Sequence, residues 1–159
     1  MGLGSYSMSD IKEFVSVGNY TAIAGGVTFH GKDNHPWVHN NDIVANYPFF
    51  EREGWDYPPS EGKGDITIGS DVWIGECARV LSGVYVGDGA IIGADCVVTK
   101  DVPCYAVMVG NPAKLVKYRY LMKIRDKLCD IEWWHWDKKR IADSIPDMKD
   151  VKLFVEKYG

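Results

Sequence analysis

The sequence predicts a mainly β fold, a prism of stacked strands with a long excursion loop and C-terminal α-helices, and three observations predict it. An aliphatic residue recurs at every sixth position across residues 66–102. The same phase occurs before residue 30, and the segment between these two stretches has no period. After residue 113 the apolar spacing becomes helical. We therefore expect a repetitive β-structure that is interrupted once and followed by helices.

The main repeat has two positions that we expect to point inward in each hexad. The first is aliphatic, at Ile68, Ile74, Val80, Val86, Ile92 and Val98. The second follows four residues later and is small or β-branched, at Val72, Ala78, Val84, Ala90, Cys96 and Val102. A helix puts residues six apart on opposite sides, and a plain strand does not tolerate a glycine in each unit. Short strands joined by corners fit instead, with freedom in φ expected at Gly69, Gly75, Gly87 and Gly93.

The same phase defines the boundaries of the predicted fold. It appears at Ile11, Val17, Ile23 and Phe29, so we expect the prism to begin near residue 11. We predict coils over residues 11–29 and 66–112, an active-site loop over 30–65 and a helical tail over 113–159, within a single domain of residues 1–159. Loops of this length are usually functional or disordered, and the aromatic residues of this one argue against disorder.

The tail shows helical spacing from Ala113, at Leu115, Val116, Tyr120, Leu121, Ile124 and Leu128. Further short helices are expected from Asp137 and over 148–158. The tryptophans of the segment WWHW, at positions 133, 134 and 136, are interpreted as packing residues that fix these helices.

Composition excludes several classes of protein. The chain has 159 residues and a net charge of −4, which argues against a nucleic-acid surface. It has no apolar run of about 20 residues, which argues against a membrane span, and its N-terminus does not resemble a secretory signal. We therefore expect a cytoplasmic protein. Its cysteines form no C-x-x-C pair and are interpreted as reduced structural thiols.

The hexads resemble the repeat of left-handed parallel β-helix acyltransferases, and the handedness of the prism is taken from that resemblance. The loop is similar to that of the xenobiotic acetyltransferases, the chloramphenicol and streptogramin enzymes, in its Asn34-His35 pair and its Tyr47-Pro48-Phe49 segment. The similarity continues through the segments at 71–75, 86–90, 98–102, 110–114 and 132–136. It thus covers nearly the whole chain.

The resemblance implies an acetyl-CoA-dependent transfer to a hydroxyl group, with His35 as the catalytic base. It implies that coenzyme A is bound along Trp73, Gly93, Ala94, Thr99, Lys100, Asn111 and Lys114. The acceptor, an antibiotic or a sugar, is expected at Asn34, Trp37, Tyr47 and Phe49. Family members are homotrimers with active sites between subunits, and a prism that buries little apolar surface gives a physical reason for such association. No metal is expected to be required.

The chemistry is consistent with these residues. Moving an acetyl group from a thioester to an alcohol requires the alcohol to lose its proton as it attacks, and an imidazole with a pKa near 6.5 suits that task. The backbone amides and lysines at the end of the prism suit the phosphates of a coenzyme. No cysteine has a histidine beside it in sequence, so we expect direct transfer without an acyl-enzyme.

Three alternatives stay open at this point. The enzyme could acetylate the amine of a nucleotide-linked amino sugar, since related enzymes on this scaffold do so. His30 and His35, with His39 nearby, have the spacing of zinc ligands in γ-class carbonic anhydrases. A non-catalytic trimeric scaffold is the third alternative. Metal analysis and a coenzyme A binding test separate the last two from the transferase.

Overall fold

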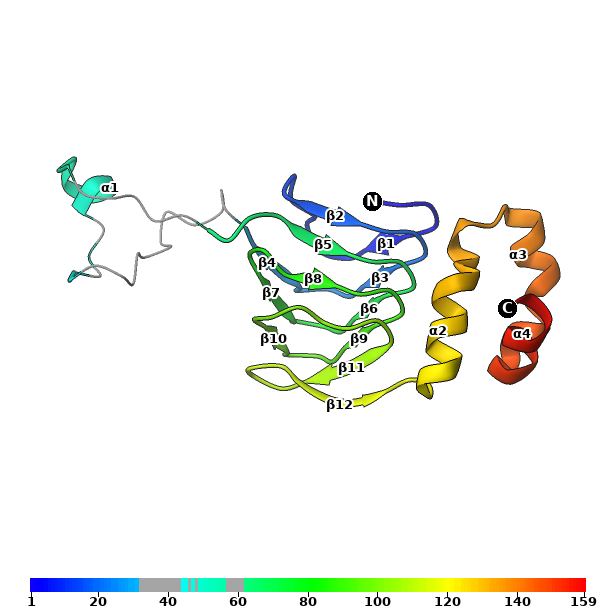
Figure 1. The fold of residues 1–159 in the computed structure, drawn as a ribbon. Coiled ribbons are helices and arrows are strands. Elements are labelled where there is room, and N and C mark those ends of the chain that lie inside the picture. The colour runs from blue at the N-terminus through cyan, green and yellow to red at the C-terminus, as the bar shows by residue number, and fades with distance from the viewer. Residues whose placement is uncertain (32–43, 46, 48, 57–61) are drawn as a thin grey trace.

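The computed structural model describes residues 1–31, 44, 45, 47, 49–56 and 62–159, and its strands form three sheets (Figure 1). Sheet A holds β1, β3, β6, β9, β11 and β12, in that order: Tyr6–Ser7, Ala22–Ile23, Trp73–Ile74, Ile91–Ile92, Ala106–Val109 and Lys114–Tyr118. Sheet B holds β2, β5 and β8: Val15–Val17, Ile66–Ile68 and Tyr85–Val86. Sheet C holds β4, β7 and β10: Thr28–His30, Arg79–Leu81 and Val97–Val98.

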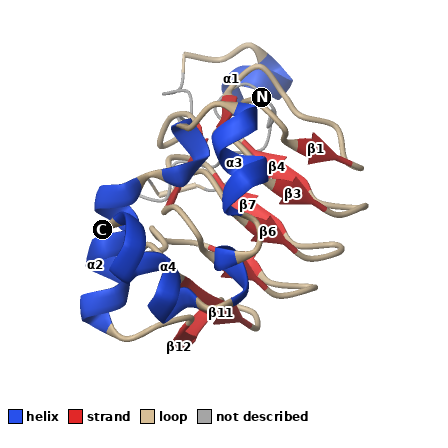
Figure 2. Cartoon of the chain, turned by 90° about the vertical axis from the view of Figure 1, so that its right-hand side faces the viewer, coloured by secondary structure: helices blue, strands red, loops and turns tan. Residues whose placement is uncertain are grey.

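The chain visits the three sheets in rotation, which the six-residue period requires. Successive strands from β2 to β10 belong to sheets B, A and C in turn, and neighbours within each sheet pair in parallel. Ile74 pairs with Ile92, eighteen positions further on, and Arg79 pairs with Val97 at the same separation. Three hexads therefore make one circuit. The circuits lie one above another in both views (Figure 1, Figure 2), and we call residues 2–30 and 66–118 the three-sheet stack.

The interior of this stack is the predicted aliphatic column. Both inward positions of every hexad from Ile68 to Val102 are at most 3% exposed. The earlier phase is confirmed as well, because Val15, Val17, Ile23, Val27 and Phe29 join the same buried cluster. Burying an aliphatic side chain of this size contributes roughly 1.5–3 kcal/mol, so the column is the main source of stability in this part of the molecule.

The glycines of the repeat have a different role from the one predicted. Gly69, Gly75, Gly87 and Gly93 do not have a positive φ; the left-handed residues lie two positions later, for example Asp71 with φ 54°. A Cβ on Gly75 would instead lie 2.6 Å from the backbone nitrogen of Ala94 in the next circuit. The expected freedom in φ was therefore wrong, and close approach between circuits requires these glycines.

Both ends of the stack differ from the expected boundaries. The stack begins before residue 11, because β1 pairs in parallel with β3 through Tyr6 and Ala22. At the other end, β12 replaces the helix that was predicted to start at Ala113, and it pairs antiparallel with β11. The free edge of β11 offers backbone hydrogen bonds to the returning chain, and this tertiary pairing overrides the helical spacing of Leu115 and Val116, which are exposed.

The predicted tail helices follow β12 and lie beside the stack (Figure 2). They are α2 over Met122–Ile131, α3 over Lys138–Ser144 and α4 over Val151–Tyr158, with 3₁₀ turns at Trp133–His135 and Asp147–Lys149. Asp137 and Asp150 cap α3 and α4 by accepting hydrogen bonds from backbone amides in the first turn. Trp134 is buried in a second core with Tyr105, Leu128, Phe154 and Val155, which confirms the packing role of the tryptophan segment. None of the described helices is both long and apolar enough to cross a membrane.

Candidate functional site

One corner of the three-sheet stack, between sheets A and C, brings together several of the predicted coenzyme residues. The backbone nitrogen of Gly93 donates to the carbonyl oxygen of Met108 at 2.9 Å. The nitrogen of Val97 donates to the oxygen of Gly110 at 3.1 Å, and the nitrogen of Ala113 donates to the oxygen of Val97 at 2.8 Å. We call residues 93–96 and 109–114 the A–C corner. It holds Gly93, Ala94, Asn111 and Lys114 in adjoining layers.

The surface of the A–C corner combines a side-chain amide with a cation. Ala94, Asn111 and Lys114 are exposed. Gly93 is partly exposed, and its backbone nitrogen is already bonded to Met108. The amide of Asn111 and the ammonium group of Lys114 suit a ligand that carries phosphate groups or amide carbonyls.

The other three predicted coenzyme residues lie around this corner rather than in it. Trp73 is on β6 of sheet A, where its side chain is 54% exposed and its backbone pairs with Ile91. Thr99 and Lys100 directly follow β10, and the chain then reaches Val102, which forms a bridge with Val86. The length of β10 therefore separates Thr99 and Lys100 from the A–C corner.

The described part of the excursion loop is organised by aromatic contacts. The rings of Tyr47 and Phe49 meet edge to face at 4.8 Å, and Phe49 stacks on Trp55 with its ring centroid 5.1 Å away. Helix α1, over Phe49–Glu53, connects them. The Tyr47 hydroxyl donates to Oε1 of Glu53 at 3.1 Å, and this hydrogen bond raises the pKa of Tyr47. Of the predicted loop residues, Asn34, His35 and Trp37 lie outside the described residues.

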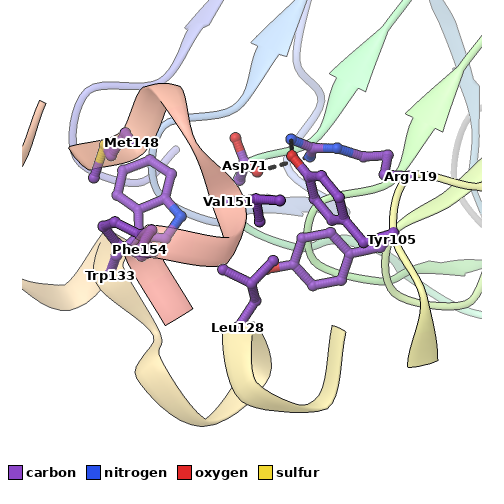
Figure 3. Close-up of a pocket in the computed structure, with 9 residues that line it drawn as sticks. Asp71, Tyr105, Arg119, Leu128, Trp133, Met148, Val151 and Phe154 are labelled. Atoms are coloured by element: carbon purple, nitrogen blue, oxygen red, sulfur yellow. Dashed lines mark hydrogen bonds and ion pairs between the residues drawn. The ribbon is translucent and has the colours of Figure 1, made fainter. Parts of the chain in front are cut away.

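A polar cluster that the sequence analysis did not identify lies between the stack and the tail helices (Figure 3). Nη1 of Arg119 donates to Oδ2 of Asp71 and to the carbonyl oxygen of Gly89, both at 2.8 Å. Burial raises the pKa of the Asp71 carboxyl, and Arg119 opposes that rise. Burial lowers the pKa of Arg119, but Asp71 and the Tyr120 hydroxyl offset this and leave it raised. No local signal in the sequence distinguishes Arg119 from the other basic residues around it, so the pair could not be predicted.

A cavity of about 180 Å³ adjoins this ion pair. Tyr105 lines it, and burial raises the pKa of its hydroxyl. The apolar side of the cavity is formed by residues of the tail, including Leu128, Val151 and Phe154. We call it the junction cavity, and no predicted site residue lines it within the described part of the chain.

The cysteines are free thiols, in agreement with the sequence analysis. Cys96 is buried in the stack, where burial raises its pKa. The pKa of Cys129 is raised to about 11, first by burial and then by the neighbouring Cys104. Raised thiol pKa values disfavour the thiolate that a nucleophilic cysteine needs.

The zinc hypothesis receives no support from the described residues. His30 ends β4, and its Nε2 lies 3.3 Å from Oγ1 of Thr28. No group of three His, Cys, Asp or Glu side chains in the described ranges is placed to hold one metal ion. His35 and His39 lie outside those ranges.

Comparison with known proteins gives the family. The model for the bacterial transferase hexapeptide (six repeats) matches residues 65–100. A chloramphenicol acetyltransferase from Morganella morganii is 34% identical over 148 residues, which cover 89% of this chain and 70% of the relative. A probable macrolide acetyltransferase from Lysinibacillus sphaericus is 39% identical over 135 residues, which cover 81% of this chain and 73% of the relative.

A solved structure agrees with these relatives. The serine acetyltransferase of Neisseria gonorrhoeae matches with a TM-score of 0.53 and 27% identity, over 79% of this chain and 40% of that one. The chain thus spans about two thirds to three quarters of the two acetyltransferases named above and less than half of this structure. On the identity and coverage of its relatives, the chain belongs to the hexapeptide-repeat acetyltransferases, in the xenobiotic group to which chloramphenicol acetyltransferases belong.

Proposed function

We propose that the protein transfers an acetyl group from acetyl-CoA to a hydroxyl group of a small molecule, an antibiotic such as chloramphenicol or a streptogramin, or a sugar. The similarity to chloramphenicol and macrolide acetyltransferases over more than four fifths of the chain carries this proposal. The A–C corner supports it, because Asn111 and Lys114 form an exposed surface suited to a phosphate-bearing coenzyme.

In this proposal coenzyme A lies along the outside of the stack. Gly93, Ala94 and Asn111 contact its pantetheine amides, Trp73 lies beside the pantetheine arm, and Lys114 interacts with the phosphates. Thr99 and Lys100 sit one corner away, so they would contact a different part of the coenzyme from Lys114. The exposure of Trp73 is consistent with a ring that covers a ligand.

His35 is the proposed general base. One imidazole nitrogen takes the proton of the acceptor hydroxyl while the oxygen attacks the thioester carbon. The carbon–sulfur bond then breaks, and the sulfur of coenzyme A leaves with a proton returned by the imidazolium. Transfer is direct, without an acyl-enzyme, and the raised pKa values of Cys96 and Cys129 support that view. Tyr47, Phe49, Asn34 and Trp37 would contact the acceptor.

The assembly is part of the same proposal. We propose that the three-sheet stack is a left-handed β-helix, that the chain forms one domain and that it works in the cytoplasm as a homotrimer with active sites between subunits. In Figure 1 helix α1 lies beyond the strands, on the side away from the tail helices, which supports a loop that reaches a neighbouring subunit. His35 of one chain would then act beside the A–C corner of another.

Replacing His35 tests the catalytic role. The variant His35→Ala should lower kcat by on the order of 10²–10⁴, the usual size of a lost general base, with coenzyme A affinity nearly unchanged. In the unmodified enzyme the rate should fall as the pH drops below the ordinary imidazole pKa of about 6.5. A variant that keeps a normal kcat would overturn this assignment and leave His30 or His39 as the candidate base.

The coenzyme contacts are tested on the lysines. Exchanging Lys100 and Lys114 for glutamate should raise the KM for acetyl-CoA far more than that for the acceptor, and should make it less dependent on salt. Comparing the single variants Lys114→Glu and Lys100→Glu separates the contribution of the A–C corner from that of the segment after β10. An effect confined to the acceptor KM would contradict the proposed groove.

The acceptor is identified by measuring acetyl-CoA consumption with chloramphenicol, streptogramin A, nucleotide-linked amino sugars and simple glycosides. A preference for an amino sugar would favour the alternative N-acetyltransferase. Absence of coenzyme A binding would favour the non-catalytic scaffold.

A further inference from the structure

Two cysteine thiols meet where the tail helices contact the three-sheet stack. Cys104 lies in the turn that leads into β11, and Cys129 lies near the end of α2. Their neighbours in sequence, Tyr105 and Leu128, are buried together in the second core, and both cysteines pack against that core. The Cys129 thiol donates a hydrogen bond to the sulfur of Cys104. The stack and the tail thus bring their sulfur atoms into direct contact.

The position of the Cys104 sulfur is fixed by the stack. A Cβ on Gly87 would lie 2.9 Å from this sulfur and 2.6 Å from the backbone nitrogen of Cys104, so only glycine leaves room for the turn. The nitrogen of the next residue, Tyr105, donates to the carbonyl oxygen of Asp88 at 2.8 Å. On the other side, Cys129 belongs to an α-helix that packs on the second core. Because both thiols are positioned before any reaction, a bond between them needs little additional ordering of the chain.

The two thiols differ in reactivity, although both are partly exposed. The pKa of Cys129 is raised to about 11, first by burial and then by Cys104, with further contributions from Asp88 and Asp126. Cys129 therefore stays protonated at neutral pH, and Cys104 is the thiol that reacts first. Once the Cys104 sulfur is bound to another group, its negative charge can no longer raise the pKa of Cys129. The second thiol then loses its proton more easily, at the stage when it has to attack.

We propose that Cys104 and Cys129 form a redox modification site, which a low-molecular-weight disulfide converts into a disulfide bond between the stack and α2. In the first step Cys104 loses its proton and attacks one sulfur of the oxidant. The S–S bond of the oxidant breaks, and its second sulfur leaves as a thiol after taking up a proton. In the second step Cys129 loses its proton and attacks the Cys104 sulfur, which releases the other half of the oxidant as a thiol. Two protein thiols are oxidised, and one small disulfide is reduced to two thiols.

The disulfide changes how the tail is attached. In the reduced form that the structure shows, only noncovalent contacts hold α2 against the stack. The cross-link closes the segment from Cys104 to Cys129 into a loop, which restricts the unfolded chain more than the folded one. We expect oxidation to raise the Tm by about 5–15 °C. Oxidising conditions would therefore fasten the tail helices to the stack.

The test exposes the folded full chain to oxidised glutathione, blocks the remaining thiols with an alkylating reagent and maps the peptides by mass spectrometry. The unmodified chain should yield a Cys104–Cys129 linkage, and thermal unfolding should show the rise in Tm. In Cys129→Ser the reaction should stop at a glutathione adduct on Cys104, because no second thiol displaces it. In Cys104→Ser the adduct on Cys129 should form at least about tenfold more slowly, because burial still raises the pKa of that thiol.

Cys77→Ser is the matched control, because Cys77 is an exposed thiol of the stack. This variant should form the same linkage and show the same rise in Tm, and dithiothreitol should reverse both. A folded chain that forms no such linkage, a linkage that appears only in urea, or a linkage without a change in Tm would overturn the proposal. Equal rates of adduct formation in the two single variants would overturn the order of attack. Neither thiol is among the proposed coenzyme or acceptor residues, so this result does not depend on the transferase proposal.

Discussion

The interior of the three-sheet stack and its junction with the tail helices are both buried, yet they are built in opposite ways. The stack interior is aliphatic, repetitive and completely filled, with Ile74, Val80 and Ile92 each 0% exposed. The junction is aromatic, contains an ion pair and leaves a cavity beside Tyr105. Two inward positions per hexad are enough to fill the core of a repeat, because every circuit presents the same surface to the next. The junction occurs only once in the molecule, so its packing depends on individual residues and not on a repeated pattern.

This difference has a functional side. The repeat forms a regular frame, and two parts of the chain do not repeat. Here these are the excursion loop, with its stacked Phe49 and Trp55, and the tail. The predictions below measure how differently the two regions respond to change.

The largest effect is expected in the stack interior. Val80→Asp places an unpaired carboxylate in the aliphatic column, where burial of a charge without a partner should cost several kcal/mol, at least about 4, or prevent folding. The matched control is Arg79→Asp, because Arg79 is exposed on the same strand. Chemical denaturation followed by far-UV circular dichroism measures both. Equal stability of the two variants would mean that the column is not the core.

A smaller effect is expected where circuits touch. In Gly75→Ala the new Cβ would lie 2.6 Å from the nitrogen of Ala94, and neither backbone can move without breaking the ladder. We expect a loss of about 2–3 kcal/mol, at the upper end of overpacking effects. Gly25→Ala is the control, since nothing lies within 4 Å of its Cβ position, and it should change stability by less than about 0.5 kcal/mol. Comparable losses in both variants would argue for a general glycine effect instead of close approach.

The smallest effect is expected at the junction. Arg119→Met removes the guanidinium that pairs with Asp71, but both side chains are about a quarter exposed, so water replaces part of the interaction. A loss of about 1–2 kcal/mol is expected. Near-UV circular dichroism, which reports the aromatic junction, should change more than the far-UV signal of the sheets. Adding Asp71→Asn should recover part of the loss, whereas a purely steric role of Arg119 would give no recovery.

The same contrast explains what the sequence could predict. The hexad positions from Ile68 to Val102 were predicted correctly because each makes the same contact in every circuit. The helices α3 and α4 were also expected, although α4 begins at Val151 instead of Met148; Asp137 and Asp150 cap them. The strand β12 was missed because its residues pair with a partner that local spacing does not reveal. The reason for the glycines was also missed, since contact between circuits depends on register and not on local conformation.

The site follows the same rule. Gly93, Ala94, Asn111 and Lys114 were among the expected coenzyme residues, and the structure brings these four to one corner. The sequence analysis did not predict that Thr99 and Lys100 lie apart from that corner, because the position of β10 depends on how the final circuit closes. The Asp71–Arg119 pair joins residues 48 positions apart and could not be derived from either segment alone. The assignment of His35 stays a prediction.

The eighteen-residue circuit, seen in the pairing of Ile74 with Ile92, also defines how such a protein can lengthen during evolution. Duplication of one whole circuit would keep every later strand in the same sheet, whereas insertion of a single strand without the rest of its circuit would rotate the later strands around the axis. The returning strand β12 and the turn before it occupy the backbone groups left open by β11 and β10. The last layer therefore closes this end of the stack, and a further circuit added there would have to pair with β12 instead of β11.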